Sequence, residues 1–223
     1  MIKENNINNI NNINMKTLTT VLESSVTPLY ESLLDDFDTL SSKTDYRKEV
    51  EEFLKANVDE YKKLIISETP NKDGLYEVSS KGNVTFVGKD NPPRLTNGFF
   101  VWTTIKGNFD CSYNLGLETL EGGPTDVMIS FLCNRCPKLE SLEGAPKKIG
   151  CDFECDWCPS LKSLKGAPKV IFANFSCCNC NSLKSLKYGP EKVGGDFSCA
   201  NCGKKFTEQD VTKLVNVGYR ITV

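Results

Sequence analysis

Phenylalanine, cysteine and leucine recur at one constant interval along the second half of this 223-residue chain. The phenylalanine column is Phe109, Phe131, Phe153, Phe175 and Phe197, and the cysteine column is Cys111, Cys133, Cys155, Cys177 and Cys199. The first four copies continue with two leucines, a proline and a valine or isoleucine. A fixed period of about 22 residues predicts a solenoid, in which each coil buries its apolar side chains against the neighbouring coils.

Each copy also carries the short-range pattern of a β-strand. Residues 108–112 alternate between polar and apolar side chains, which places Phe109 and Cys111 inward and their polar neighbours outward. Stacked in register, these segments form a parallel sheet on one face. The return path contains Gly-x-Pro or Gly-Ala-Pro in most copies, and proline disfavours helix there. We therefore expect a mainly β fold, with polyproline-like turns opposite the sheet.

The remaining sequence predicts an appendage and two caps. Val50, Leu54 and Val58 lie on one helical stripe among glutamates and lysines, which is typical of an amphipathic helix. The Asn-rich N-terminus has the composition of a disordered segment. We divide the chain into an acidic, low-complexity and partly disordered leader (1–42), an amphipathic helix (43–69) and a solenoid (70–223) with a hairpin N-cap (75–105), repeats (106–205) and a C-terminal cap (206–223).

The N-terminal cap is predicted from two apolar segments, 76–78 and 84–87, that flank a polar connection typical of a hairpin. The residues at 81–84 resemble those at 106–109, so we also interpret this segment as an irregular first coil.

The C-terminal cap is predicted to combine a helix and a strand. Thr207 and Asp210 have the spacing of a helix-capping pair. Tyr219 and Ile221 stand one repeat interval after Phe197 and Cys199, the last members of the two columns. We therefore expect them to fill the same inward positions.

The pattern Phe-x-Cys-x-x-(Asn/Cys)-x-x-Leu-x-x-Leu over residues 84–223 resembles the core of leucine-rich repeats. With its G-x-F-x-C and G-A-P-K signatures, it is similar to short repeat proteins encoded by bacteria and their phages. The resemblance implies a parallel sheet whose strand-bearing face binds a macromolecule. For a phage-encoded protein it further implies that the partner is a host factor, including a component of host defence.

Four C-x-x-C pairs raise the question of a zinc site. The interval between Cys136 of one pair and Cys155 of the next lies within the range found in zinc sites. The pairs nevertheless share the solenoid period, and Asn114 replaces the second cysteine in the first copy. Asparagine suits a column of side chains bonded to the backbone better than it suits zinc. We favour a buried cysteine ladder without a cofactor, keep a small structural zinc protein as an alternative, and expect Cys178 to face solvent as the most reactive thiol.

Composition excludes several function classes. The chain has no histidine, so imidazole-based catalysis and histidine metal sites are absent. Residues 81–223 carry 18 basic and 14 acidic side chains, too small an excess to predict nucleic-acid binding. No apolar run approaches the ~18 residues of a membrane helix, and no secretory signal is recognisable. We expect a cytoplasmic protein (in the host cell, if phage-encoded) that binds neither a membrane nor a small molecule.

We predict a non-enzymatic protein-interaction module whose partner has a basic surface. The outward positions of the third copy are acidic, and aromatic and arginine side chains stand beside them, as binding hot spots favour. The predicted partner-binding residues, which we expect to contribute nothing to coil stacking, are Asp110, Tyr113, Arg135, Asp152, Glu154, Asp156 and Trp157. The alternative is a structural or virion-associated protein that docks through its N-terminal segment.

On one flank, Glu140–Lys162 and Glu143–Lys165 are expected to pair between coils.

Overall fold

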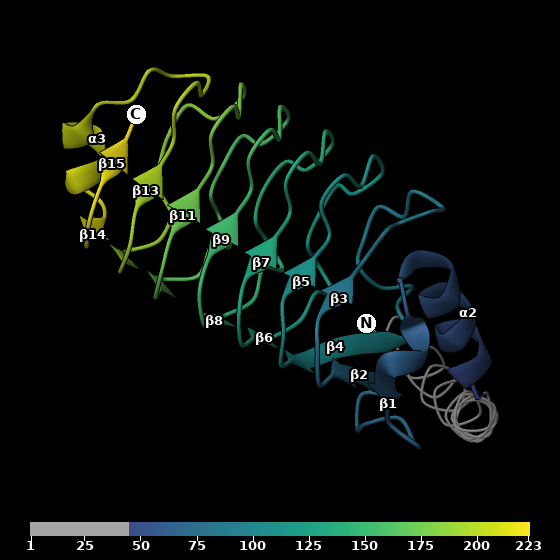
Figure 1. The fold of residues 1–223 in the computed structure, drawn as a ribbon. Helices are drawn as coiled ribbons and strands as arrows, with labels where there is room; N and C mark the ends of the chain where they lie inside the picture. The colour runs from purple at the N-terminus through teal and green to yellow at the C-terminus, as the bar shows by residue number, and fades with distance from the viewer. Residues whose placement is uncertain (1–44) are drawn as a thin grey trace, which may run out of the picture. The chain divides into compact units, whose positions relative to one another are not determined.

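Two columns of short parallel strands form the walls of a solenoid in the computed structural model, which describes residues 45–223 (Figure 1). The first column, here the phenylalanine sheet, has seven strands in register, so that phenylalanine lies opposite phenylalanine in successive coils. Its strands are β3 (Val84–Thr85), β5 (Phe109–Asp110), β7 (Phe131–Leu132), β9 (Phe153–Glu154), β11 (Phe175–Ser176), β13 (Phe197–Ser198) and β15 (Ile221–Thr222). The predicted mainly β solenoid is therefore confirmed.

The other wall, here called the second sheet, is a further column of strands, and in the repeats it stands where the sequence predicted only turns. Its strands are β1 (Leu64–Ile66), β2 (Tyr76–Ser80), β4 (Phe100–Ile105), β6 (Asp126–Val127), β8 (Lys148–Ile149), β10 (Val170–Ile171), β12 (Lys192–Val193) and β14 (Asn216–Val217). Four of these strands, β6, β8, β10 and β12, have only two residues, one of them a buried valine or isoleucine, and so are too short to show a period of two. Pairing is interrupted between β8 and β10.

Stacked aromatic rings fill the space between the two sheets. The rings of Phe131 and Phe153 have centroids 5.4 Å apart, and those of Phe153 and Phe175 lie 5.7 Å apart. All five phenylalanines of the column are fully buried, and both leucine columns are buried beside them. Because identical rings repeat at each coil, the core is continuous from Phe109 to Phe197.

Helix α2 (Arg47–Asn57) closes the N-terminal end of this stack. It buries Val50 and Leu54, and the ring of Phe53 lies 5.7 Å from that of Phe100. Trp102 then meets Phe109 edge to face at 5.3 Å, so aromatic contacts extend from the helix into the repeats. The exposed apolar end of a solenoid is covered in this way.

The helix is shorter than the range 43–69 predicted from the sequence. Glu60 has a left-handed backbone (φ 53°), a 3-10 turn (η1) follows at Tyr61–Lys63, and β1 then pairs antiparallel with β2. The Asp59 N–H donates to the Thr85 carbonyl, so the chain leaves the helix to pair with the sheets. These tertiary hydrogen bonds override the helical pattern of the sequence.

The predicted N-terminal hairpin is wrong, whereas the irregular first coil is confirmed. Strand β2 pairs with β1 and β4, while β3 pairs in parallel with β5, so residues 81–83 form a corner between the two sheets. Val84 lies opposite Phe109, as the repeated motif predicted.

The C-terminal cap contains α3 (Glu208–Thr212), which begins with the predicted capping box of Thr207 and Asp210. This last coil is longer than the four regular coils between Phe109 and Phe197, so Ile221 and not Tyr219 lies opposite Phe197. Tyr219 is 85% exposed, and its predicted inward position is therefore wrong.

With 11 and 5 residues, α2 and α3 are the α-helices of the described region, and neither is long enough to cross a membrane.

Replacing Phe153 by alanine should lower the free energy of unfolding by about 3–5 kcal/mol, because a cavity replaces a ring stacked on both sides. Urea denaturation measures this change. Phe172, which is 71% exposed, is a matched control, and Phe172→Ala should change the stability by less than about 0.5 kcal/mol. Equal effects of the two substitutions would contradict the inward assignment of Phe153.

Candidate functional site

A column of polar side chains links the coils just before each strand of the phenylalanine sheet. The Asn108 side-chain oxygen accepts the Ser130 N–H at 2.9 Å, and the Asp152 carboxylate accepts the Asn174 N–H at 2.9 Å. Asn174 in turn accepts the Asp196 N–H at 2.8 Å. Asp152, predicted to be free for a partner, is therefore part of the stacking between coils.

A second polar column follows the strands and includes Asp156. Ser112 accepts the Asn134 N–H at 3.0 Å, Asn134 accepts the Asp156 N–H at 2.7 Å, and Asp156 accepts the Cys178 N–H at 2.6 Å. The Asp156 carboxylate also accepts the Ser176 hydroxyl at 2.6 Å. The expectation that this acid contributes nothing to stacking is wrong, because its oxygens satisfy backbone and hydroxyl donors of the next coil.

The remaining predicted acids lie between these columns, on the outward face of the strands. Glu154 accepts a hydrogen bond from the Asn134 side chain at 3.0 Å, and Asp110 accepts the Ser112 N–H at 2.9 Å. Both residues are half-buried. The strand face thus carries several carboxylates whose hydrogen bonds leave their negative charge in place, since the donors are neutral groups.

The three other predicted residues form a projecting line at the corner after the strands. Tyr113, Arg135 and Trp157 have left-handed backbones, with φ of 63°, 56° and 58°. Asn179 and Asn201 occupy the same position and conformation in the later coils. Asparagine tolerates this conformation, whereas bulky side chains rarely adopt it. The asparagines of this column were the sequence signal for a left-handed corner, and the sequence analysis missed it.

Within this line, which we call the aromatic ridge (Tyr113, Arg135 and Trp157), the arginine is held between two rings. The Arg135 guanidinium carbon lies 5.6 Å from the Tyr113 ring centroid and 5.0 Å from the Trp157 ring centroid. The two aromatic residues are 69% and 51% exposed. A shallow groove of about 380 Å³ runs along the ridge and is also lined by Leu115, Pro137 and Pro159. The sequence-predicted ridge residues are thus brought together beside the acidic strand face.

The cysteine ladder is confirmed. Each thiol in the second column donates to a cysteine carbonyl one coil earlier, as Cys158 does to Cys133 at 3.3 Å and Cys180 to Cys155 at 3.2 Å. In the first coil, the Asn114 amide donates to the Phe86 carbonyl at 2.8 Å instead. Burial raises the pKa of the first-column thiols of Cys111, Cys133 and Cys155 well above the ordinary value. All 11 cysteines are free thiols.

Cys178 does not have the exposed position expected from the sequence. It is half-buried, and burial raises its pKa, which keeps the thiol protonated near neutral pH. Cys151 and Cys202 are also half-exposed.

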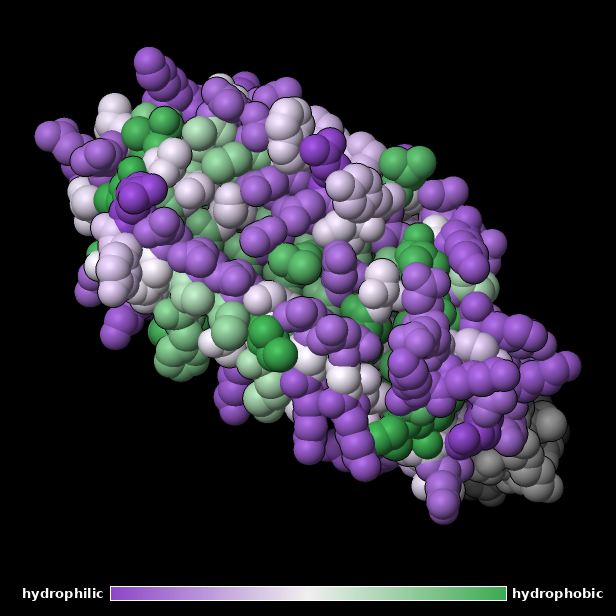
Figure 2. All heavy atoms as spheres, in the orientation of Figure 1, coloured by the Kyte–Doolittle hydropathy of each residue, from purple (hydrophilic) through white to green (hydrophobic). Residues whose placement is uncertain are grey.

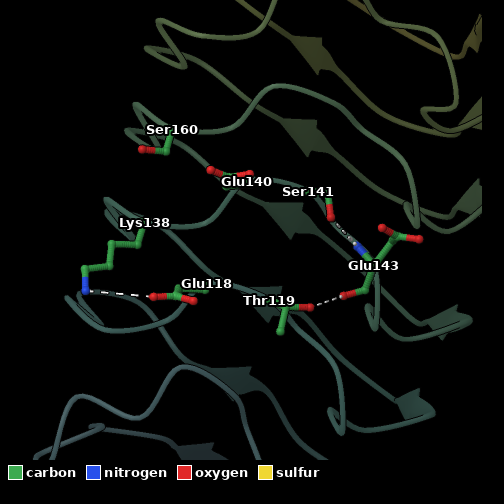
Figure 3. A pocket seen from close by; sticks show the side chains of 7 residues that line it. All are labelled: Glu118, Thr119, Lys138, Glu140, Ser141, Glu143 and Ser160. Carbon is green, nitrogen blue, oxygen red and sulfur yellow. Dashed lines mark hydrogen bonds and ion pairs between the residues drawn. The ribbon is translucent and has the colours of Figure 1, made fainter.

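The charged flank pairs between coils as predicted. Lys162 lies 2.7 Å from Glu140, and Lys165 lies 2.8 Å from Glu143. A polar hollow of about 520 Å³ separates the glutamates on this flank (Figure 3). Glu118 also has a lysine partner, Lys138, at 3.9 Å. Such exposed pairs contribute about 0–1 kcal/mol each, so this flank is a solvated surface.

Replacing Asp156 by alanine should lower the free energy of unfolding by about 1–3 kcal/mol, because the Cys178 N–H loses its acceptor. Asp156→Asn is the matched control, since Asn134 fills this position one coil earlier. Denaturant unfolding should show near-native stability for the asparagine variant. An alanine variant as stable as the native protein would refute the role of Asp156 in stacking.

Alkylation of the folded protein near neutral pH should be confined to the three half-exposed thiols, Cys151, Cys178 and Cys202, since the other cysteines are buried, and it should be slow at Cys178 because burial raises the pKa of that thiol. Peptide mapping by mass spectrometry identifies the labelled sites, and unfolding in denaturant should make every cysteine reactive. Rapid labelling of Cys133 or Cys155 in the folded state would argue against the ladder.

No protein-family model, curated protein or solved structure matches this chain. The resemblance to leucine-rich repeats therefore depends on the residue pattern alone. The structure itself establishes a solenoid of parallel strands, with coils stacked in register and a ladder of buried cysteines.

Proposed function

We propose that this protein is a non-enzymatic interaction module that binds a protein partner through the aromatic ridge and the adjoining strand face. The observation that carries the proposal is the left-handed backbone of Tyr113, Arg135 and Trp157. Three bulky side chains occupy a conformation that costs about 1–2 kcal/mol per residue, at a position where the later coils have asparagine. The stability of the fold therefore does not explain why bulky residues, and not asparagine, occupy this position in the first three copies.

The chemistry of the ridge supports a protein as the partner. Tryptophan, tyrosine and arginine dominate the binding energy of protein interfaces because they offer a large contact area with little loss of side-chain entropy. The Arg135 guanidinium is held by two rings, so a partner does not need to order it. Leu115 and Pro137 add apolar surface to the groove.

The charge of the strand face specifies the partner further. Asp110 and Glu154 lie on this face between the two polar columns, and the carboxylates of Asp152 and Asp156 lie at its borders. The negative charge of these carboxylates favours a partner with lysine or arginine at its surface and disfavours the phosphates of nucleic acid. The sequence pattern of short bacterial and phage repeat proteins favours a bacterial host factor as this partner.

The test replaces all three ridge residues by asparagine, the residue of the later coils. Tyr113→Asn, Arg135→Asn and Trp157→Asn relieve backbone strain at three residues and remove two cation–π contacts, so the combined variant should be at least as stable as the native protein. Capture of the partner from a bacterial lysate, identified by mass spectrometry, should be lost. Tyr188→Asn is the control, because Tyr188 is also exposed and left-handed (φ 69°) but does not line the groove.

Two outcomes would contradict the proposal. In the first, the triple variant captures the same partner as the native protein. In the second, capture survives the triple change and is lost when residues 1–42 are deleted, which would make the N-terminal segment the functional element.

A further inference from the structure

A second group of exposed apolar side chains lies on the second sheet, near its interruption between β8 and β10. Met128 is 53% exposed and Phe172 is 71% exposed, two coils apart at the same position of the repeat. Val170 is also exposed. Figure 2 shows that apolar side chains reach the surface as separate groups among hydrophilic ones. This group plays no part in the aromatic ridge and was not predicted from the sequence.

Gly150 turns these side chains into the walls of a notch. It occupies the same repeat position as Met128 and Phe172, in the coil between them, and a Cβ there would collide with the Met128 carbonyl oxygen. Glycine at this position lets the two coils approach closely, and a hollow of about 410 Å³ lies beside it, between Met128 and Phe172, with Val127 and Ile149 also in its lining. A hollow of this size accommodates one large apolar side chain of a partner.

Lysines border the notch. Lys147 and Lys148 line it, and Lys192 lies opposite Val170 in the paired strands β10 and β12. Asp126 is 3.8 Å from Lys148. Within residues 45–223, Lys147 and Lys192 form no ion pair with a carboxylate, so the rim carries uncompensated positive charge. The second sheet therefore has the opposite charge preference to the strand face of the phenylalanine sheet.

We propose that this notch binds an acidic amphipathic segment of a second protein partner, with one large apolar side chain inserted between Met128 and Phe172. The apolar walls supply the affinity, and Lys147 and Lys192 select segments with aspartate or glutamate beside the inserted side chain. A bilayer fits the site less well, because membrane association needs projecting apolar side chains, whereas this site is concave.

The test selects peptides from a randomised peptide display library on the immobilised full-length protein and removes those that also bind the Met128→Ala/Phe172→Ala variant. Both residues are exposed, so the variant should fold normally. The surviving peptides should combine a leucine, phenylalanine, methionine or tryptophan with two or more acidic residues. Fluorescence anisotropy then measures their dissociation constants.

Binding of these peptides should weaken several-fold in each single variant, Met128→Ala and Phe172→Ala, because the inserted side chain contacts both walls of the notch. The Lys147→Glu/Lys192→Glu variant should weaken binding about threefold or more, and added salt should reduce that difference. Tyr188→Ala removes an exposed aromatic side chain elsewhere and should leave binding unchanged.

Each of the following results would overturn the proposal. No peptide survives the counter-selection, or the surviving peptides are basic or uncharged. The native protein binds anionic phospholipid vesicles and the Met128→Ala/Phe172→Ala variant does not, which would make the site a membrane contact. Sedimentation shows a dimer that Phe172→Ala dissociates, which would make the occupant a second copy of this chain.

Discussion

Hydrogen bonds between equivalent positions of successive coils are the constraint on which this structure depends. The main chain of each strand, the Asn, Ser and Asp side chains at its borders and the thiols of the second cysteine column all bond to the neighbouring coil. Each coil must therefore present the same groups at the same places, which explains why the period of the repeat does not drift. A side chain that differs from its equivalents in the other coils, and forms no hydrogen bond between coils, is therefore easy to recognise.

Much of the fold follows from that regularity and could be predicted. The phenylalanine column alone specified an in-register parallel sheet, because rings at a fixed spacing can be buried only by stacking. The second sheet escaped prediction because two-residue strands have no visible period. The length of α2 and the register of the last coil depend on tertiary hydrogen bonds and on α3, and local sequence patterns do not contain these contacts.

The residues of the candidate site were predicted from the sequence, but their arrangement in space was not. Tyr113, Arg135 and Trp157 were identified as outward-facing, yet only the backbone shows that they share a strained corner and stack on one another. Asp152 and Asp156 also face outward, but counting alternate positions cannot reveal that their oxygens accept N–H groups of the next coil. The notch beside Gly150 is formed by side chains of three successive coils, and a search within one copy of the repeat overlooks such a site.

The additional length of the final coil has a consequence for self-association. An open edge of regular coils is a template on which another chain could continue the sheet. Here the last coil is longer than the regular coils before it, and it offers Ile221 where a phenylalanine ring would be needed. The side chain at that edge cannot extend the aromatic stack, although the backbone of β15 pairs in register with β13. The C-terminal coil thus offers a neighbouring chain a backbone edge but no phenylalanine ring on which the aromatic stack could continue.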